Sequence, residues 1–338
     1  MFGTKTKISL FFLLAVVSLV GHNYIKQYEK CGDEILLNNW SLHSSTGSTT
    51  EIKENVLYLF SLDRNKSVDI KQNILHVVSG STLQLSADIK CENVISGVDT
   101  YNRARLLLMQ YDREGNGLNL PHQVASIFGT HEWDSYNNYF TISPDTKQII
   151  VSAQLSKSTG AFWLKNIHLY PVIQTHAYTY FKIIILVIWA IYFIILLGPC
   201  FINIKNNIVI RITLVLVFIL IIIGVTIPSD MKFQITDYAN ELINSLGVVS
   251  EGYFTFDLTK IGHFFFFFLF GLVFSFLQKD ESDTMVITNI VLLAGSTEIM
   301  QLFIDGRSFL LWDIIIDLNG ALYGFILSKL LISIRRDI

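Results

Sequence analysis

Residues capable of acid–base or headgroup chemistry are concentrated near the C-terminus, inside stretches that are otherwise apolar. Three pairs have helical spacing: Lys260 and His263, Glu298 and Gln301, and Asp313 and Asp317. Residues three or four positions apart share one face of a helix, so the members of each pair would point in the same direction. Such pairs inside apolar sequence indicate a polar site that the helices bring together.

The residue types suggest two kinds of chemistry. His263 with Glu298 or Asp317 could act as acid and base. Lys260 and Arg307 could hold a phosphate or diphosphate headgroup, because a guanidinium group suits bidentate contacts with phosphate oxygens. The predicted headgroup-binding set is Lys260, Gln301, Arg307 and Asp313, and the predicted acid–base set is His263, Glu298 and Asp317.

Membrane-spanning helices would have to position these residues. Of the 338 residues, 51% are hydrophobic and only 16% are charged, and the apolar residues collect in runs. Six windows are long enough to cross a hydrocarbon core of roughly 30 Å. They lie at about 8–21, 181–198, 207–227, 261–277, 285–304 and 311–333. The sequence therefore predicts a polytopic helical membrane domain over 179–338.

The first window follows a short basic segment with Lys5 and Lys7, so residues 1–22 are either a membrane anchor or a secretory signal. In both cases residues 23–178 would be exported and the later spans keep the same directions. We therefore predict a multi-pass protein of the cytoplasmic membrane. The turn around Arg307 and the adjoining helix ends would face the extracytoplasmic side.

The depth of the polar residues bears on what they do. Glu298 and Asp317 are each about six residues from a helix end, which at 1.5 Å per residue is roughly 9 Å below the outer boundary. An isolated charge at mid-helix costs about 2.5–3.5 kcal/mol, so we expect three basic and three acidic groups to pair. One interpretation is that the cluster only ties three helices together. Buried ion pairs add little net stability, however, which favours a functional site.

Residues 32–172 have a different character. Short stretches of alternating polarity are separated by Gly, Asn, Asp and Ser, which is typical of an all-β sandwich. The clearest are "STLQLSADIK", "ARLLLMQYD", "QIIVSAQL" and "FWLKNIHLYPV". Roughly eight such strands would form a jelly roll. The fold class is therefore a helical membrane domain joined to an exported β-sandwich.

The strand sequences, with the turn-like "FGTHEWDSYNNYF", resemble galactose-binding-like jelly rolls, a group that includes carbohydrate-binding modules. The resemblance implies an extracellular polysaccharide as a partner. Trp133, Tyr136 and Tyr139 are the candidates for stacking on sugar rings, although aromatic residues in a sandwich also serve as core or loop anchors. Many relatives carry an Asp near a calcium site where this chain has Lys165 and Asn166, so calcium is not expected.

A second resemblance covers about 257–328, and reaches about 181 if the earlier spans are included. The runs are "KIGHFFFFFLFGLVFSF" and "STEIMQLFIDGRSFLLWDIIIDLNGALYG". They resemble the VanZ-like membrane family, named after a teicoplanin-resistance protein, in its Lys-x-x-His, Glu-x-x-Gln, Arg-x5-Asp and double-Gly pattern. Thr259 stands where relatives often have Asp, and Asp317 where many have Asn. The resemblance implies a bacterial cell-envelope role and a link to antibiotic resistance, without a reaction.

Three classes of function follow. The first is a site, enzymatic or not, for a membrane lipid or lipid-linked envelope glycan. The second is a non-catalytic, membrane-anchored protein that binds a glycan or a partner and whose charged cluster is structural. The third, a proton-coupled transporter, is weaker because no internal repeat or polar path to the cytoplasmic side is evident.

Other chemistry finds little support in the sequence. No basic tract or motif indicates nucleic acid, and there is no Gly-rich phosphate loop, Gly-x-Ser-x-Gly motif or spaced metal motif. His263 and Glu298 could join a metal site, but one His with carboxylates is a weak signal, so neither metal nor cofactor is expected. Two further expectations are open: a disulfide between Cys31 and Cys91, and a surface helix over 235–246.

Overall fold

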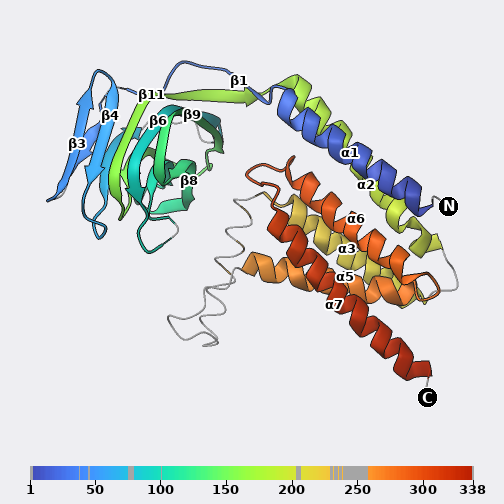
Figure 1. The fold of residues 1–338 in the computed structure, drawn as a ribbon. Helices are drawn as coiled ribbons and strands as arrows, with labels where there is room; N and C mark the ends of the chain where they lie inside the picture. Colours follow the sequence, from blue (N-terminus) through green and yellow to red (C-terminus); the bar gives the residue numbers. More distant parts are fainter. Residues whose placement is uncertain are drawn as a thin grey trace. The chain divides into compact units, whose positions relative to one another are not determined.

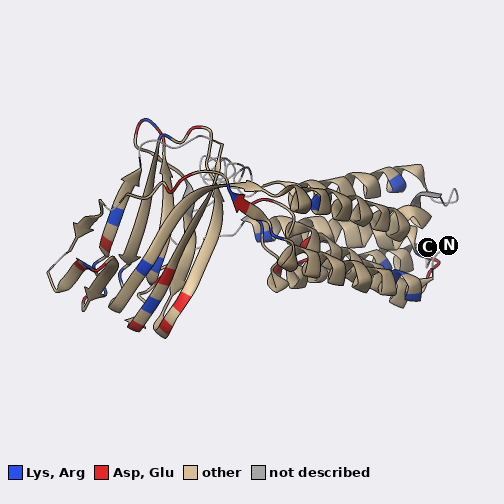
Figure 2. Cartoon of the chain, turned by 90° about the horizontal axis from the view of Figure 1, so that it is seen from above, with Lys and Arg blue, Asp and Glu red and all other residues tan. Residues whose placement is uncertain are grey.

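The computed structural model divides the chain into two compact units (Figure 1). One contains Tyr28–Thr175, and the other contains Met1–Gln27 with His176–Ile338. The structure describes residues 3–37, 39–44, 46–74, 80–99, 101–202, 207–228 and 258–336, together with Met231, Ile235 and Tyr238. Charged residues recur along the strands of the first unit and are sparse on the helices of the second (Figure 2).

The first unit is a sandwich of two antiparallel sheets. The order of one sheet is β3 (Ser48–Lys53), β4 (Val56–Ser61), β11 (Thr159–Gln174), β6 (Thr82–Ile95) and β9 (Gly129–Thr141), and β1 (Tyr28–Lys30) also pairs with β11. The order of the other is β2 (Ser41–His43), β5 (Val68–Ile74), β10 (Gln148–Leu155), β7 (Ala104–Tyr111) and β8 (Gly117–Ile127). The predicted two-sheet sandwich is therefore confirmed.

Alternating polarity explains these strands. In β6, every second residue from Leu83 to Ile89 is buried in the sandwich core, whereas the residues that alternate with them are half-buried on the other face. The four stretches with the clearest alternation became β6, β7, β10 and β11. Both inner faces contribute to a single hydrophobic core within this unit.

Two details of the sandwich differ from the sequence prediction. The stretch 128–140 is not a turn, because β9 begins at Gly129 and pairs with β6 over most of its length. Gly129 has φ +84°, so it makes the bend after Phe128, and the aromatic residues that follow favour a strand. The described sandwich also has more than eight strands, because the short, largely exposed β1, β2 and β3 carry weak alternation.

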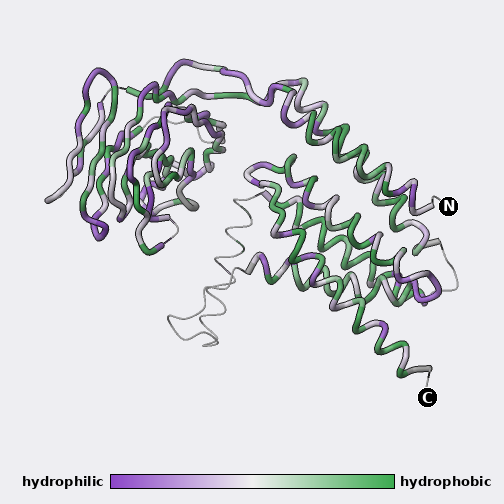
Figure 3. Tube along the Cα trace, in the orientation of Figure 1, coloured by the Kyte–Doolittle hydropathy of each residue, from purple (hydrophilic) through white to green (hydrophobic). Residues whose placement is uncertain are grey.

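The six apolar windows are all helical. The helices are α1 (Thr4–Tyr24), α2 (His176–Ile202), α3 (Ile208–Thr226), α5 (Leu258–Leu277), α6 (Asp283–Gln301) and α7 (Leu311–Arg336). Among the described helices, five are long and apolar enough to cross a membrane, and α6 is not one of these (Figure 3). The helical unit nonetheless has the apolar character of a membrane domain.

Helix α6 is the internal helix of this unit. Every residue from Leu292 to Gln301 is buried. Phe11 of α1 packs at Gly295, and Lys7 of α1 reaches Asn289. Because neighbouring helices cover so much of α6, its polar residues need not face lipid. This explains how a helix of low hydropathy can lie within an apolar bundle.

The first helix is part of the same packing. Lys7 is 2% exposed, and its Nζ donates to Asn289 Oδ1 at 3.2 Å and to the carbonyl oxygen of Leu196 at 3.4 Å. Farther along α1, Trp189 Nε1 donates to Ser18 Oγ at 3.0 Å. These buried contacts make α1 part of the packing of the helical unit.

Six helix termini lie at one end of the helical unit: the ends of α1, α3 and α6 and the starts of α2, α5 and α7. His22, near the end of α1, lies 2.9 Å from the Tyr178 hydroxyl at the start of α2, and its ring contacts Phe303 just after α6. Arg307, in the turn between α6 and α7, donates to the carbonyl oxygen of Gly224 near the end of α3. We call this the site end of the bundle. The chain leaves it after Gln27 to form the sandwich and returns to it at His176.

Helices α5 and α7 run parallel and approach each other at the backbone. A Cβ on Gly320 would lie 2.2 Å from the carbonyl oxygen of Phe264, and one on Gly324 would lie 2.1 Å from that of Phe268. Gly271 of α5 is equally close to the carbonyl oxygen of Ala321. Small residues at such positions allow membrane helices to pack closely. This contact sets the distance between side chains on the two helices.

The structure bears on the possible disulfide but describes little of the possible surface helix. Cys31 is exposed, Cys91 is buried, and both are free thiols in this structure, so no disulfide joins them. Of the surface helix expected over 235–246, the structure describes only Ile235 and Tyr238; the rest lies outside the described residues.

The glycine contacts lead to a stability prediction. Gly324→Ala should lower the free energy of unfolding by about 1–3 kcal/mol, because the added Cβ forces α5 and α7 apart. Gly198→Ala in α2 is the matched control, since nothing lies within 4 Å of the added Cβ. Unfolding in mixed detergent micelles compares the two variants. Equal stability would contradict the close approach of α5 and α7.

The packing of α1 leads to a second prediction. Purified protein should retain residues 4–24, because removal would expose the bundle residues that α1 covers. Intact-mass spectrometry of protein expressed in a bacterial host measures this directly. A mature N-terminus between residues 20 and 30 would show that the segment is a cleaved signal.

Candidate functional site

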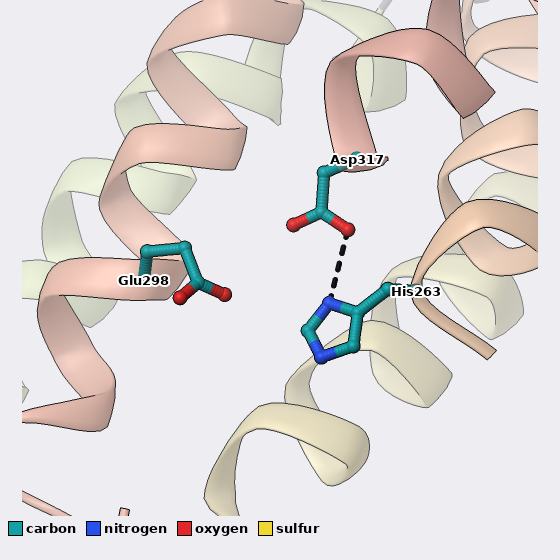
Figure 4. A group of neighbouring side chains, drawn as sticks. All are labelled: His263, Glu298 and Asp317. Carbon is teal, nitrogen blue, oxygen red and sulfur yellow. Dashed lines mark hydrogen bonds and ion pairs between the residues drawn. The ribbon is translucent and has the colours of Figure 1, made fainter. Parts of the chain in front are cut away.

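Three of the predicted residues meet at the site end. His263 lies in the second turn of α5, Glu298 in the last turn of α6 and Asp317 in the second turn of α7. One nitrogen or oxygen atom from each lies within 4.8 Å of the others. His263 Nδ1 is 3.0 Å from Asp317 Oδ1, and the carboxyl group of Glu298 points toward both residues (Figure 4). The sequence-based prediction thus placed these residues on three helices that do converge.

The two carboxyl groups are buried and incompletely satisfied. Glu298 and Asp317 are both 0% exposed. Gln301 Nε2 donates to Glu298 Oε1 at 2.5 Å, but Glu298 Oε2 and Asp317 Oδ2 have no hydrogen-bond partner among the described residues. A buried polar atom without a partner costs about 1–3 kcal/mol, and more if it is charged. These two oxygen atoms are where a proton or ligand would be stabilised most.

Asp313 and Arg307 border this group. Asp313 is buried one turn before Asp317 and lies close enough to act electrostatically on all three residues of the cluster. Arg307 is half-buried and interacts electrostatically with Glu298 and Asp313. Its Nη2 donates to the carbonyl oxygen of Gly224 at 3.0 Å, while its Nε is buried without a partner among the described residues. Arg307 therefore brings positive charge to the edge of an acidic group.

Lys260 is exposed on the first turn of α5, one turn before His263. Glu298, Asp313 and Asp317 are buried, whereas His263 and Arg307 are half-buried. The exposed Asp305, in the same turn as Arg307, instead pairs with Lys182 at 3.1 Å.

The three aromatic candidates in β9 separate into two environments. Trp133 is 39% exposed, and Lys165 Nζ lies 4.3 Å from its ring centroid. Tyr139 is half-buried and stacks on Tyr28 with centroids 4.3 Å apart. Tyr136 packs against the sandwich core. Trp133 and Tyr139 are thus the two whose rings lie outside the core.

Strand register reveals further aromatic residues that sequence reasoning missed. Trp163 pairs with Lys90 across β11 and β6 and lies 5.2 Å from Tyr58, centroid to centroid. Tyr170 pairs with Gln84, which in turn pairs with Tyr139. We call the outer surface of this sheet the aromatic face, defined by Tyr28, Tyr58, Trp133, Tyr139, Trp163 and Tyr170. Period-two alternation in β4 and β11 was the signal that could have identified it.

Cations and a polar network accompany these rings. Lys30 Nζ lies 3.4 Å from the Tyr170 centroid, and Lys90 Nζ lies 5.9 Å from that of Trp163. Asp88 accepts hydrogen bonds from Ser135 at 2.5 Å and from Asn166 at 2.7 Å. These bonds, with that from Ser135 foremost, hold the pKa of Asp88 below its ordinary value. The aromatic face therefore combines ring surfaces with fixed polar groups.

Comparisons with known proteins found one family model and several solved structures that match part of the chain. The VanZ/LLP1 family model matches residues 183–332. No curated protein matched the chain. Similar solved structures include the enzymatically active domain of bacteriophage CBA120 tailspike protein 4, at 17% identity and a TM-score of 0.29. That match covers 40% of this chain and 19% of the tailspike chain.

Two carbohydrate-binding modules are also similar. A module of the CBM4 type is 14% identical with a TM-score of 0.31, over 41% of this chain and 94% of the module. The CBM22-1 xylan-binding domain of Paenibacillus barcinonensis Xyn10C is 13% identical with a TM-score of 0.30, over 42% of this chain and 97% of the domain.

The family match falls on the helices that carry His263, Glu298, Arg307 and Asp317, which confirms the resemblance inferred from their spacing. Residues 183–332 are therefore similar to the VanZ/LLP1 family, and they follow a two-sheet β-sandwich in the same chain.

Proposed function

We propose that this protein is a multi-pass protein of the bacterial cytoplasmic membrane that binds the headgroup of a phospholipid or lipid-linked envelope glycan. The headgroup would lie at the outer leaflet, and the sandwich would bind polysaccharide on the extracytoplasmic side. The observation that carries the proposal is the buried group of His263, Glu298 and Asp317, with two carboxylate oxygens lacking partners among the described residues. The link to glycopeptide resistance is part of the same proposal.

The course of the chain supports placing the site and the sandwich on one side of the membrane. The chain leaves the helical unit after α1 and re-enters it at α2, both at the site end. A folded sandwich with many charged residues does not lie within the hydrocarbon core. Whichever side receives the sandwich therefore also receives the polar site. If residues 28–175 are exported, as we propose, the site would lie at the outer leaflet.

The polar atoms support a ligand more than a purely structural cluster. Ionisable groups within a membrane are costly and ordinarily face a pathway or cavity with a function. A cluster that only joined helices would gain most by pairing every oxygen. Glu298 Oε2 and Asp317 Oδ2 are instead left without partners among the described residues. Polar atoms of a ligand would satisfy them.

Each residue has a role in this proposal. Arg307, at the border of the buried group, would contact a phosphate oxygen, and the exposed Lys260 would contact the headgroup from the first turn of α5. The hydrogen bond with Asp317 orients His263, whose imidazole would exchange a proton with the ligand. Glu298, held by Gln301, would be the second proton-exchanging group. Asp313 would contact hydroxyl groups of a glycan.

A second candidate function has its own support. The hydrogen bond between His263 and Asp317 joins the same two helices that interlock through Gly320 and Gly324. In this alternative the cluster is structural, and the protein is a non-catalytic anchor that presents the sandwich to a glycan or partner protein. Substitutions in the cluster and analysis of copurified lipid distinguish headgroup binding from a structural role.

The aromatic face supports the polysaccharide partner. Trp133 and Trp163 offer ring surfaces of the kind that stack on the apolar faces of sugars. Asp88, Ser135 and Asn166 form a polar network nearby that could bind hydroxyl groups. In the unliganded sandwich, Lys165 lies over Trp133, so a sugar ring would displace its ammonium group.

If the cluster binds a headgroup, substitutions in it should remove activity without reducing the amount of folded protein. Glu298→Ala, His263→Ala and Arg307→Ala should each abolish the envelope phenotype, read as teicoplanin susceptibility, while folded membrane protein stays at the wild-type level. Asp305→Ala is the matched control, because Asp305 is exposed in the same turn. If the three variants lose stability equally and activity per folded molecule survives, the cluster is structural.

Lipid that copurifies with the protein tests the ligand directly. We expect mass spectrometry to find a phospholipid or lipid-linked glycan enriched over the bulk lipid extract. This enrichment should disappear in Arg307→Ala and persist in Asp305→Ala. A lipid profile identical to the bulk extract in wild-type protein would contradict headgroup binding.

The aromatic face leads to a binding prediction. Trp133→Ala should weaken binding of the full-length protein to cell-wall polysaccharide by about 2- to 10-fold, as expected for an aromatic contact of about 0.5–1.5 kcal/mol. Tyr101→Ala, an exposed aromatic outside the aromatic face, should bind like wild type. Pull-down on immobilised polysaccharide compares them. Equal binding by both variants would exclude Trp133 from the contact.

A further inference from the structure

We propose that His263, Glu298 and Asp317 form a binding site for a divalent transition-metal ion within the membrane domain. The three residues come from α5, α6 and α7, so they do not form a short motif in the sequence. Among the described residues they are the group of His, Cys, Asp and Glu side chains whose ligand atoms converge closely enough for a metal. This inference concerns the bound ion and does not depend on headgroup binding.

The distances are close to those of a metal centre. Bonds of about 2.0–2.1 Å around a tetrahedral ion place its ligand atoms about 3.3 Å apart. The 3.0 Å between His263 Nδ1 and Asp317 Oδ1 is near this value. The widest separation in the group is within 4.8 Å, so a small rotation of the Glu298 carboxyl group would complete three ligands. Figure 4 shows that this carboxyl group already points toward the other two residues.

The charges of the group match a divalent ion. Two ionised carboxylates and a neutral imidazole carry two negative charges, which one divalent cation neutralises. The ion would take the place of the hydrogen bond between His263 and Asp317, with Nδ1 as ligand and the imidazole proton on Nε2. With Asp317 Oδ1 as the second ligand, the ion would also coordinate Glu298 Oε2, which now lacks a partner among the described residues. A low-dielectric surrounding strengthens this pairing.

The surrounding groups orient the ligands and modulate the charge. Gln301 Nε2 donates to Glu298 Oε1, a bond of the kind that fixes a coordinating carboxylate and leaves Oε2 for the ion. Asp313 adds negative potential, whereas Arg307 adds positive potential at the border. The backbone contact of Gly320 with Phe264 holds His263 and Asp317 at a fixed spacing. The site is thus supported on two rigid helices.

The donor set indicates which ions fit. One imidazole with two carboxylates suits Zn²⁺ or Mn²⁺, whereas Mg²⁺ prefers oxygen ligands and retains several waters. Three protein ligands leave a fourth tetrahedral position open, as in zinc sites that bind water or substrate. A phosphate oxygen could take that position. The site would then bind anionic ligands more tightly when the ion is present.

Metal titration of the full-length protein tests the proposal. Protein with a non-histidine affinity tag is purified in detergent, stripped with EDTA and titrated with Zn²⁺ against a chromophoric chelator. We expect one equivalent of Zn²⁺ per chain. Glu298→Gln, Asp317→Asn and His263→Gln, which keep side-chain size, should each weaken Zn²⁺ binding at least about 100-fold. Asp305→Asn, an exposed carboxylate at the same end, should retain one equivalent at wild-type affinity.

Substitution with Co²⁺ supplies a readout that needs no variant. Co²⁺ bound to nitrogen and oxygen ligands in four-coordinate geometry should give visible absorption bands that Zn²⁺ abolishes by displacement. This spectrum decides the question if the variants fail to elute as a single species.

Two results would overturn the proposal: less than about 0.1 equivalent of Zn²⁺ on wild-type protein without Co²⁺ bands, or wild-type affinity in all three ligand variants. Either would leave Glu298 and Asp317 sharing protons instead. If the protein binds no metal but copurifies with enriched lipid, the metal proposal fails and the headgroup proposal stands. If it binds one metal ion per chain but no enriched lipid, the headgroup proposal fails and the metal site stands.

Discussion

Buried carboxyl groups in an apolar bundle need compensation, and this need shapes the membrane domain. Glu298 and Asp317 are fully buried, so their stability depends on what the neighbouring helices and any ligand place opposite them. The close backbone contact between α5 and α7 brings His263 within hydrogen-bonding distance of Asp317. Glu298 approaches from α6, the helix that its neighbours cover almost completely along its last ten residues.

The same constraint explains the unusual composition of α6. A helix that faced lipid could not carry Asn289, Ser296, Thr297, Glu298 and Gln301 without a large insertion cost. Hydroxyl groups bond within the helix, as Ser296 does to the carbonyl oxygen of Leu292, and Asn289 accepts from Lys7. Glu298 remains as the group whose second oxygen has no partner among the described residues. Buried polar atoms without partners among the described residues therefore include three at the site end, on Glu298, Arg307 and Asp317, and also Ser328 Oγ farther along α7.

Much of this arrangement could be predicted from sequence, for identifiable reasons. Apolar runs of sufficient length located all six helices, and helical spacing predicted that His263, Glu298 and Asp317 share a depth. Period-two alternation located β6, β7, β10 and β11. It failed for 128–140, where exposed polar residues between Trp133 and Tyr139 suggested a turn although the backbone pairs with β6. Spacing gave Lys260 a shared face with His263 but could not give its exposure, because helical spacing does not determine the burial of a long side chain. Tyr136 was grouped with Trp133 because its orientation toward the core depends on register with Ala87.

We infer that the buried cluster serves a ligand and not the stability of the fold. The most direct test is the free energy of unfolding of metal-free protein in which His263→Leu, Glu298→Met and Asp317→Leu are combined. Apolar groups of similar size often match or exceed a buried polar cluster in stability. We expect this variant to be at least as stable as wild type and to have lost the envelope phenotype. A loss of several kcal/mol, measured beside Gly198→Ala as the neutral control, would contradict it and assign the cluster to holding the helices together.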